Sequence, residues 1–319
     1  MRIATLQFNP SLGAVDFNIT RANALLASLT QPIDLLVLPE LAFSGYNFPS
    51  LEAITPYLEP TAAGTSTTWA ITTAKRLSCH VIVGYPEHSD EDGRNYNATV
   101  TVSPTGETLL NYRKSFLYYT DETWASEGPD GSSHQHSKPH HTPFFTGRLG
   151  TLGAGMTIGH GICMDINPYK FLAPWTDYEF ATSMLSKQAK LVVLSTAWLT
   201  RLLPEELELE PAAPDMETVA YWLERMFPLL TSEEEIVVVF ANRCGTEGTR
   251  VGKVEVENGQ TVEEGDRVCY AGSSCVMKFQ QGGVRIFERG EGPSILGKGE
   301  EGVLVVDTEK PARYLLQSR

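Results

Sequence analysis

Short apolar runs, each preceded by a segment with helical periodicity, constrain the fold of this chain more than any other feature. The runs are Leu35–Leu38, Leu191–Leu194 and Ile236–Phe240. They are too short for buried helices, and their lack of alternation is typical of strands that are covered on both faces. The helical segments before them extend from about Asp16 to Leu29, from Tyr178 to Ala189 and from Met216 to Leu230. This order predicts parallel strands in a layered α/β fold.

Other segments predict antiparallel strands in the same fold. Ala98–Val102 and Thr108–Tyr112 flank the turn Pro104-Thr-Gly-Glu107 and are expected to form a hairpin. Thr151–Met164 alternates like a strand and ends at Cys163. We also expect a helix over Trp69–Leu77 and strands over Ile3–Phe8, Val81–Gly84, Ser274–Phe279 and Val303–Val306. The sheets are therefore predicted to be mixed, within one domain that spans residues 1–319.

The composition argues against several partners and locations. Hydrophobic residues make up 42% of the chain and charged residues 20%, which is the composition of a soluble globular protein. The net charge of -14 repels phosphate and argues against nucleic acid as a partner. No run reaches the roughly 18 apolar residues of a membrane-spanning helix, and the N-terminal segment alternates like a strand rather than a targeting signal. Five scattered cysteines favour a reducing cytoplasm.

Glu40 is the first residue positioned for chemistry. It follows the run Leu35–Leu38 and Pro39, so its carboxylate lies where a strand ends and a loop begins. Sites in α/β proteins form at such strand ends, and partly apolar surroundings raise the pKa of a carboxyl group toward values useful for proton transfer. A single glutamate at such a place is nevertheless more often an ordinary surface residue.

Lys114 ends the predicted hairpin, with Arg113 immediately before it. Alternation sends these two cations to opposite faces, so one of them is expected to point inward. An inward Lys114 would stabilise a developing oxyanion, whereas an outward one would be a solvated surface residue. Glu122 is a candidate partner that would hold the lysine charged and aimed.

Cys163 has the richest local context of the five cysteines. It lies in Gly159-His-Gly-Ile-Cys-Met-Asp-Ile-Asn-Pro-Tyr-Lys170, between a predicted strand and a loop, where backbone N–H groups are free near the sulfur. Glycines on both sides of His160 indicate close approach of another segment. The alternative is a buried, inert cysteine, which is what we expect of Cys79, Cys244, Cys269 and Cys275.

Three competing signals are weaker. Gly153-Ala-Gly155 with Gly159 resembles a dinucleotide-binding loop, but it misses the G-x-G-x-x-G spacing and lies within strand-like alternation. The histidines of segment 134–141 are dense enough to bind a metal, yet they lie among Ser, Pro and Gln in a predicted surface loop. The chain also lacks a G-x-S-x-G elbow. These signals favour neither a dinucleotide site, a metal site nor a serine hydrolase.

Taken together, the contexts of Glu40, Lys114 and Cys163 resemble the nitrilase superfamily of carbon–nitrogen hydrolases, in which Glu, Lys and Cys occur in this order. The matching blocks are Leu36-Val-Leu-Pro-Glu-Leu-Ala-Phe-Ser-Gly-Tyr46, Tyr112-Arg-Lys-Ser-Phe-Leu117 and Gly161-Ile-Cys-Met-Asp165. The resemblance implies a four-layer αββα sandwich of two mixed β-sheets, a Glu40–Lys114–Cys163 triad, and neither a metal nor an organic cofactor. Glu122 would orient the lysine without reacting.

Within the superfamily, two stretches are most similar to fungal amidohydrolases that act on protein N-terminal asparagine or glutamine. They are Lys114-Ser-Phe-Leu-Tyr-Tyr-Thr-Asp-Glu-Thr-Trp124 and Cys163-Met-Asp-Ile-Asn-Pro-Tyr-Lys-Phe171. The resemblance implies that polypeptides with N-terminal Asn or Gln are the substrates and that their deamidation is an early step of N-degron processing. The assembly expected is a monomer or a homodimer.

A free N-terminus carries an α-ammonium group, which requires an anion in the pocket. Asp165 is the nearest candidate, with a structural role as its alternative; Glu127, Thr196 and Tyr46 are further substrate-binding candidates. Two other functions remain open: a small-molecule ω-amidase or carbamoylase of the same superfamily, and a non-catalytic binding module on its scaffold. Preference for free glutamine over a Gln-initiated peptide would favour the first, and failure of iodoacetamide to label Cys163 would favour the second.

Overall fold

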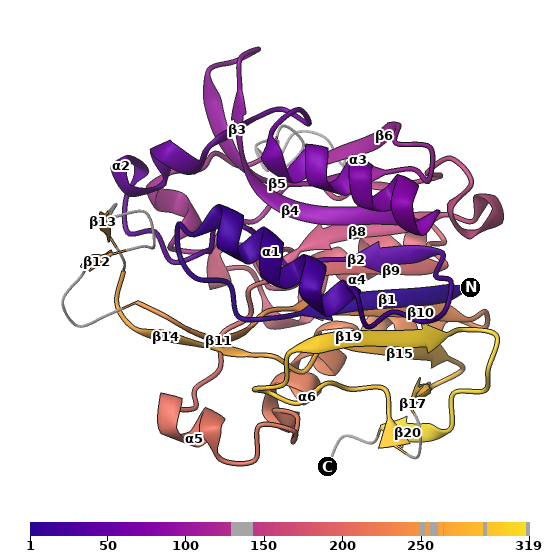
Figure 1. Ribbon diagram of the computed structural model, residues 1–319. Helices are drawn as coiled ribbons and strands as arrows, with labels where there is room; N and C mark the ends of the chain where they lie inside the picture. Colours follow the sequence, from indigo (N-terminus) through magenta and orange to yellow (C-terminus); the bar gives the residue numbers. More distant parts are fainter. Residues whose placement is uncertain (129–142, 249–252, 256–260, 264, 290–291, 317–319) are drawn as a thin grey trace.

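Two mixed sheets form the centre of the computed structural model, which describes residues 1–128, 143–248, 253–255, 261–263, 265–289 and 292–316 (Figure 1). The first sheet consists of β1 (Arg2–Gln7), β2 (Leu35–Val37), β3 (Glu59–Pro60), β4 (His80–Ser89), β5 (Arg94–Val102), β6 (Thr108–Arg113) and β19 (Gly302–Asp307). Its strand order is β19-β1-β2-β4-β5-β6, with β3 paired to β4. β1, β2 and β4 are parallel, whereas β5 and β6 form the predicted antiparallel hairpin.

The second sheet consists of β7 (Thr146–Gly147), β8 (Ile158–Ile162), β9 (Leu191–Thr196), β10 (Ile236–Asn242), β15 (Cys275–Gln280), β16 (Gly283–Ile286) and β20 (Tyr314–Leu316). Its strand order is β20-β16-β15-β10-β9-β8-β7. β8, β9 and β10 are parallel, and the outer strands pair antiparallel. The three apolar runs of the sequence are therefore inner parallel strands, as their lack of alternation predicts.

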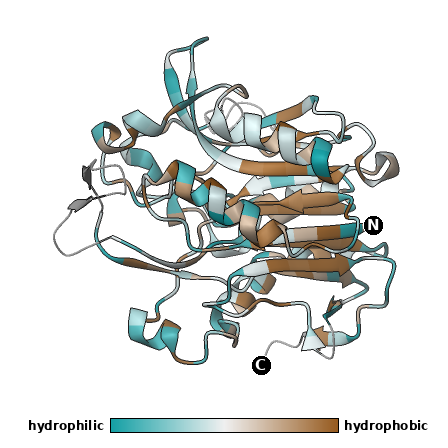
Figure 2. Cartoon of the chain, viewed as in Figure 1, coloured by the Kyte–Doolittle hydropathy of each residue, from teal (hydrophilic) through white to brown (hydrophobic). Residues whose placement is uncertain are grey.

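Hydrophobic cores separate four layers. Ile3, Val37 and Ile82 of the first sheet pack with Val193 and Val239 of the second sheet between the two sheets. The helices α1 (Val15–Leu26) and α3 (Thr65–Leu77) cover the outer face of the first sheet, and α4 (Glu179–Ser186) and α6 (Met216–Arg225) cover that of the second (Figure 1). The central strands are accordingly the most hydrophobic part of the cartoon (Figure 2). The predicted αββα sandwich is confirmed.

The predicted elements around the second sheet are shorter than expected. The strand expected over Thr151–Met164 is limited to β8, because Leu152–Gly155 forms a 3-10 turn in which Gly153 and Ala154 have left-handed φ angles of 61° and 52°. The helix expected over Met216–Leu230 ends at Arg225 and is followed by the 3-10 helix Phe227–Thr231. Pro228 explains this end, because proline cannot donate a helical hydrogen bond.

Several short strands and helices lie outside the two central sheets. They are the pairs β11 (Cys244–Glu247) with β14 (Val268–Ala271), β12 (Lys253–Glu255) with β13 (Thr261–Glu263), and β17 (Glu288–Arg289) with β18 (Gly292–Pro293), together with the short helices α2 (Leu51–Ile54) and α5 (Pro204–Glu208). Further 3-10 helices cover Thr55–Tyr57, Asp121–Thr123, Cys163–Ile166, Tyr169–Phe171 and Trp175–Asp177. In the described ranges, no helix has the length and apolar character needed to traverse a membrane.

Candidate active site

Loops that follow strands of both sheets meet at one end of the sandwich. Glu40 lies shortly after β2 and Lys114 directly after β6 in the first sheet, while Cys163 directly follows β8 and Ala197 directly follows β9 in the second. Loops at the carboxyl ends of parallel strands are where α/β proteins build their sites. The structure therefore brings the three predicted catalytic residues together.

Glu40 lies fully buried at the centre of this group. Its Oε1 accepts hydrogen bonds from Lys114 Nζ at 2.6 Å and from Asn97 Nδ2 at 2.7 Å, and its Oε2 accepts one from the Ala197 N–H at 2.8 Å. Burial raises the pKa of Glu40 above its ordinary value; Lys114 opposes this rise and Asp121 adds to it. A carboxylate with a raised pKa accepts protons more readily than a solvated one.

A sharp turn of the backbone places Glu40. Leu41, the next residue, adopts a left-handed φ of 45°. Gly84 of β4 lies against this turn, and a Cβ atom there would come within 2.7 Å of the Pro39 carbonyl oxygen and 2.8 Å of Glu40 Cα. Because only glycine permits this approach, the neighbouring strand fixes the backbone that carries the carboxylate.

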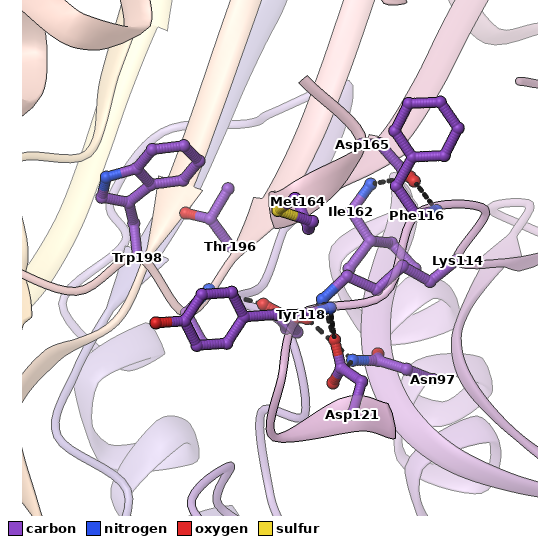
Figure 3. Close-up of polar contacts among 12 residues, drawn as sticks. Asn97, Lys114, Phe116, Tyr118, Asp121, Ile162, Met164, Asp165, Thr196 and Trp198 are labelled. Carbon is purple, nitrogen blue, oxygen red and sulfur yellow. Dashed lines mark hydrogen bonds and ion pairs between the residues drawn. The ribbon is translucent and has the colours of Figure 1, made fainter. Parts of the chain in front are cut away.

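Lys114 is also fully buried, and two carboxylates share its ammonium group. Figure 3 shows one of them, Asp121, beside the lysine. Its Nζ lies 2.6 Å from Glu40 Oε1 and 2.5 Å from Asp121 Oδ2. Burial alone would lower the pKa of Lys114, but Asp121 and Glu40 outweigh it, so the pKa is raised and the lysine stays charged. Arg113 points to the opposite face and pairs with Glu87 at 2.6 Å, as the alternation predicts.

The predicted pairing of Glu122 with Lys114 is wrong. Glu122 is exposed, and its Oε1 lies 3.7 Å from Lys170 Nζ. The 3-10 turn Asp121–Thr123 directs Asp121 inward instead, where its Oδ1 accepts from Asn97 Nδ2 and its Oδ2 from the Tyr118 N–H, both at 2.9 Å. The acid that faces Lys114 is thus Asp121, because the conformation of the turn directs this side chain inward.

Cys163 lies at the transition from β8 to the 3-10 helix Cys163–Ile166, with a left-handed φ of 42°. A residue other than glycine rarely adopts this conformation, and strain of this kind is common at reacting residues. Burial and the charge of Glu40 raise the pKa of the thiol well above its ordinary value, against the opposing effects of Lys114 and the Ala197 N–H. The sulfur is therefore a protonated thiol at rest, beside a buried carboxylate.

Asp165 is fully buried and its carboxylate is bonded within the protein, so its predicted contact with an α-ammonium group is wrong and the structural alternative holds. Its Oδ1 accepts from the N–H groups of Ser115 and Phe116 at 3.0 and 2.8 Å. Its Oδ2 accepts from the Ile162 N–H and the Tyr112 hydroxyl, both at 2.8 Å. Burial raises the pKa of this carboxyl group to about 6. Asp165 ties the turn after β8 to the segment after β6 (Figure 3).

A cavity of about 400 Å³ opens beside the Cys163 thiol. Its floor consists of the buried residues Tyr46, Cys163, Met164, Asn167 and Ala197. Tyr118, Trp198 and Tyr221 form aromatic walls, and Figure 3 shows the first two together with Met164. Its mouth lies at the exposed residues Phe171, Arg201 and Glu217. Tyr46 is therefore placed where a substrate-binding residue is expected.

Thr196 and Glu127 are not among the described residues that line this cavity. Thr196 is fully buried, and its Oγ1 donates to Asn242 Oδ1 at 2.9 Å. Glu127 accepts a hydrogen bond from the Tyr169 hydroxyl at 2.8 Å. Both predicted substrate contacts are therefore replaced by contacts within the protein.

The sequence analysis missed two acidic residues of the cavity wall, Asp215 and Glu217. Asp215 caps helix α6, because its Oδ1 accepts from the N–H groups of Glu217 and Thr218 at 3.1 and 3.3 Å. Its Oδ2 accepts from the hydroxyls of Thr200 and Thr218 at 2.7 and 2.9 Å. An Asp just before a predicted helix is a capping signal, so the capping role of Asp215 could be predicted from the sequence. The position of Asp215 in the cavity wall depends on the tertiary fold.

A second buried ion pair fixes the loop that carries Tyr46. Glu247 lies 2.5 Å from Arg243, and both side chains are buried. The Glu247 carboxylate also accepts from the N–H groups of Tyr46 and Asn47 at 3.1 and 2.9 Å, and from the Tyr270 hydroxyl at 2.6 Å. These bonds hold the floor of the cavity from below.

Within the residues that the structure describes, no group of three His, Cys, Asp or Glu side chains is placed to hold a metal ion. The histidines of segment 134–141 lie outside the described residues.

Comparison with known proteins agrees with this geometry. A protein N-terminal amidase of Schizosaccharomyces pombe is 31% identical over 328 residues, covering 97% of this chain and 100% of that protein. A protein N-terminal amidase of Saccharomyces cerevisiae is 34% identical over 211 residues, which cover 62% of this chain and 45% of that protein. Two crystal structures of an N-terminal amidase, one with a Gln-Val peptide and one with an Asn-Glu peptide, share the fold with a TM-score of 0.74, 22% identity and coverage of 96% of both chains.

The family model of carbon–nitrogen hydrolases matches residues 2–172, a range that includes Glu40, Lys114 and Cys163. This range is more than half of the chain, and the relative from S. pombe extends the similarity over almost all of it. The chain therefore belongs to the carbon–nitrogen hydrolase family.

Proposed function

We propose that this chain hydrolyses the side-chain amide of an N-terminal Asn or Gln of a polypeptide, giving Asp or Glu and ammonia. The observation that carries the proposal is one cavity with the Cys163 thiol at its floor and with Asp215 and Glu217 in its wall, while the buried Glu40–Lys114 pair acts on this thiol from behind the floor. The floor provides for amide hydrolysis, and the acidic wall provides for the α-ammonium group of a chain end. The names of the two fungal relatives and the peptides in the solved structures support the same substrate.

Glu40 starts the proposed reaction by accepting the thiol proton of Cys163. The thiolate attacks the amide carbon, and the Lys114 ammonium and the Met164 N–H stabilise the oxyanion that forms. Glu40 then gives its proton to the amide nitrogen, and ammonia leaves a thioester on Cys163. The raised pKa values of Glu40 and Cys163 support this order, because the base is poised and the nucleophile is protonated at rest.

Water completes the cycle. Glu40 removes a proton from the water molecule, hydroxide adds to the thioester carbon, and the tetrahedral intermediate expels the thiolate, which regains its proton from Glu40. Asp121 and Asn97 hold the Lys114–Glu40 pair in place during both halves of the reaction. We assign them positioning roles, since their side-chain bonds go to Glu40, to Lys114 and to each other.

We propose Asp215 as the main acceptor of the α-ammonium group, with Glu217 at the mouth as a second anion. The hydroxyls of Thr200 and Thr218 donate to Asp215, and the Thr200 oxygen also accepts from the Leu202 N–H at 3.2 Å. Each hydroxyl oxygen has two lone pairs, so both can still accept from a bound ammonium group. A cation at this point neutralises a carboxylate that is only 8% exposed. Free N-termini are therefore expected to bind better than blocked ones.

The reaction is tested by mass spectrometry of short peptides that begin with each amino acid. Wild-type protein should add about one mass unit to peptides that begin with Asn or Gln, and Cys163→Ala should abolish this change while the circular dichroism spectrum stays unchanged. Full activity of the variant would refute the mechanism. Preference for free glutamine over a Gln-initiated peptide would instead indicate a small-molecule ω-amidase.

The ammonium site is tested with Asp215→Asn, which removes the charge and keeps a good helix cap. Wild-type protein should hydrolyse a Gln-initiated peptide with a higher kcat/KM than its Nα-acetyl derivative, by roughly two orders of magnitude for one buried ionic contact. The variant should lose most of this preference through KM. An unchanged preference would remove Asp215 from the site.

The wider setting of the reaction is also a proposal. The net charge of -14 supports peptide ends rather than nucleic acid as partners, and the scattered cysteines support a reducing cytoplasm. A product with a new acidic N-terminal residue supports a place early in N-degron processing.

A further inference from the structure

Exposed apolar side chains gather beside the mouth of the cavity. Phe171, Leu172 and Trp175 are 41%, 85% and 39% exposed, and Tyr119 of a neighbouring loop is 62% exposed. We name these four residues the apolar rim. Single exposed apolar residues are normal on protein surfaces, but a contiguous group next to a binding site marks a surface that another molecule covers.

Ring contacts connect the apolar rim with the cavity. Phe171 itself lines the mouth, and its ring centroid lies 6.1 Å from that of Tyr119. On the other side, the ring of Trp175 lies 5.5 Å from that of Tyr221, which forms a wall of the cavity. Tyr119 and Trp175 therefore each contact a residue that lines the cavity.

The segment that carries the rim is held in a defined conformation. Arg225 is buried, and its Nη1 donates to the Trp175 carbonyl at 2.6 Å while its Nε donates to the Ile166 carbonyl at 2.9 Å. Lys170 and Phe171 both adopt left-handed φ angles, of 53° and 55°. Two such residues in succession, neither of them glycine, are costly and persist where surrounding contacts enforce them. The rim is thus preorganised to present its apolar side chains.

We propose that the apolar rim binds the second and third residues of the polypeptide substrate and gives the enzyme a preference for apolar side chains there. This inference rests on the proposed function. With the side-chain amide at Cys163 and the α-ammonium group at Asp215, the substrate backbone must leave through the mouth, where Phe171 is the exposed apolar residue. Residues that follow the first one then pass over the rim and bury its surface.

The experiment compares Gln-Leu-Leu-Ala with Gln-Ser-Ser-Ala, which differ only at the second and third residues. Wild-type protein should show a kcat/KM about tenfold higher for the leucine peptide, through a lower KM, as burial of apolar groups in a pocket of this kind provides. Leu172→Ser and Tyr119→Ser should each reduce this ratio severalfold. The matched control is Leu315→Ser, which removes a leucine that is 48% exposed on β20, a strand separated from β9 by three others in the second sheet.

Each outcome has a distinct meaning. A ratio near one in the wild-type protein, or a ratio that both rim variants keep, overturns the rim proposal and leaves the proposed function standing. Absence of hydrolysis of either peptide by the wild-type protein overturns the proposed function and the rim proposal with it. Sedimentation is measured in parallel: a wild-type dimer that Leu172→Ser converts to a monomer shows that a second copy covers the rim, and this also overturns the proposal.

Discussion

His160 offers a test of how the interior around the catalytic strand responds to pH. The side chain is buried within β8; its Nδ1 lies 3.0 Å from the Val193 carbonyl oxygen and its Nε2 lies 2.5 Å from Thr99 Oγ1. The neutral ring that fits these partners donates from Nδ1 and accepts the threonine hydroxyl at Nε2. Burial lowers the pKa of His160 from an ordinary 6.5 to about 4.

This lowered pKa couples protonation to stability. Between pH 6.5 and 4 the unfolded chain binds a proton at His160 and the folded chain does not, so the free energy of unfolding falls as the pH falls through this window. A pKa difference of about 2.5 corresponds to about 3 kcal/mol. Above pH 7 both states are neutral at this residue, and its contribution no longer depends on pH.

The variant His160→Asn keeps a donor near Nδ1 and removes the titrating ring. We expect urea unfolding to show a lower stability of the variant at pH 7, because Thr99 loses its acceptor, and a gap to wild type that closes by about 3 kcal/mol on going to pH 4. His88→Asn is the control, since the His88 side chain is 43% exposed. A stability difference between wild type and His160→Asn that stays constant over this pH range would refute the reasoning.

Two further predictions concern the buried charges. Asp121→Asn removes an anion that raises the pKa of Glu40, so the acid limb of the pH profile of kcat/KM should move to lower pH. The rate at pH 7 should fall about tenfold or more, because Glu40 becomes a weaker base. Glu122→Gln is the control and should match wild type, and an equal effect of both variants would contradict the assignment of Asp121 as the partner of Lys114. Glu247→Gln leaves the Arg243 charge buried without its partner, so urea unfolding should show a loss of about 3 to 5 kcal/mol, and a loss below about 1 kcal/mol would contradict the role of this pair.

The parallel strands of the fold were predictable because their sequence pattern survives in three dimensions. Val37, Val193 and Val239 face the space between the sheets while their neighbours face the helices, so both faces of the three apolar runs are covered and alternation with polar residues is not needed there. The start of the strand before Cys163 was not predictable in the same way. Left-handed conformations at Gly153 and Ala154 replace its first half by a turn, and alternation alone does not reveal them.

The residues of the site also fall into a predictable group and an unpredictable group. Glu40, Lys114 and Cys163 were predictable because each occurs at a strand end within a recognisable local block. Asp121 and Asp215 were not, because their roles depend on a single turn and on a helix start that the fold brings to the cavity from a distant part of the chain. Local patterns carry the reacting groups, and long-range packing determines which acids surround them.

The position of Glu40 also determines when the enzyme becomes active. One of its carboxylate oxygens is held by Lys114 from the first sheet and the other by the Ala197 N–H from the second. A nascent or partly unfolded chain, in which the two sheets have not yet docked, has the thiol and the base in separate halves. Such a chain cannot deamidate its neighbours during synthesis, so the architecture itself delays catalytic competence until folding is complete.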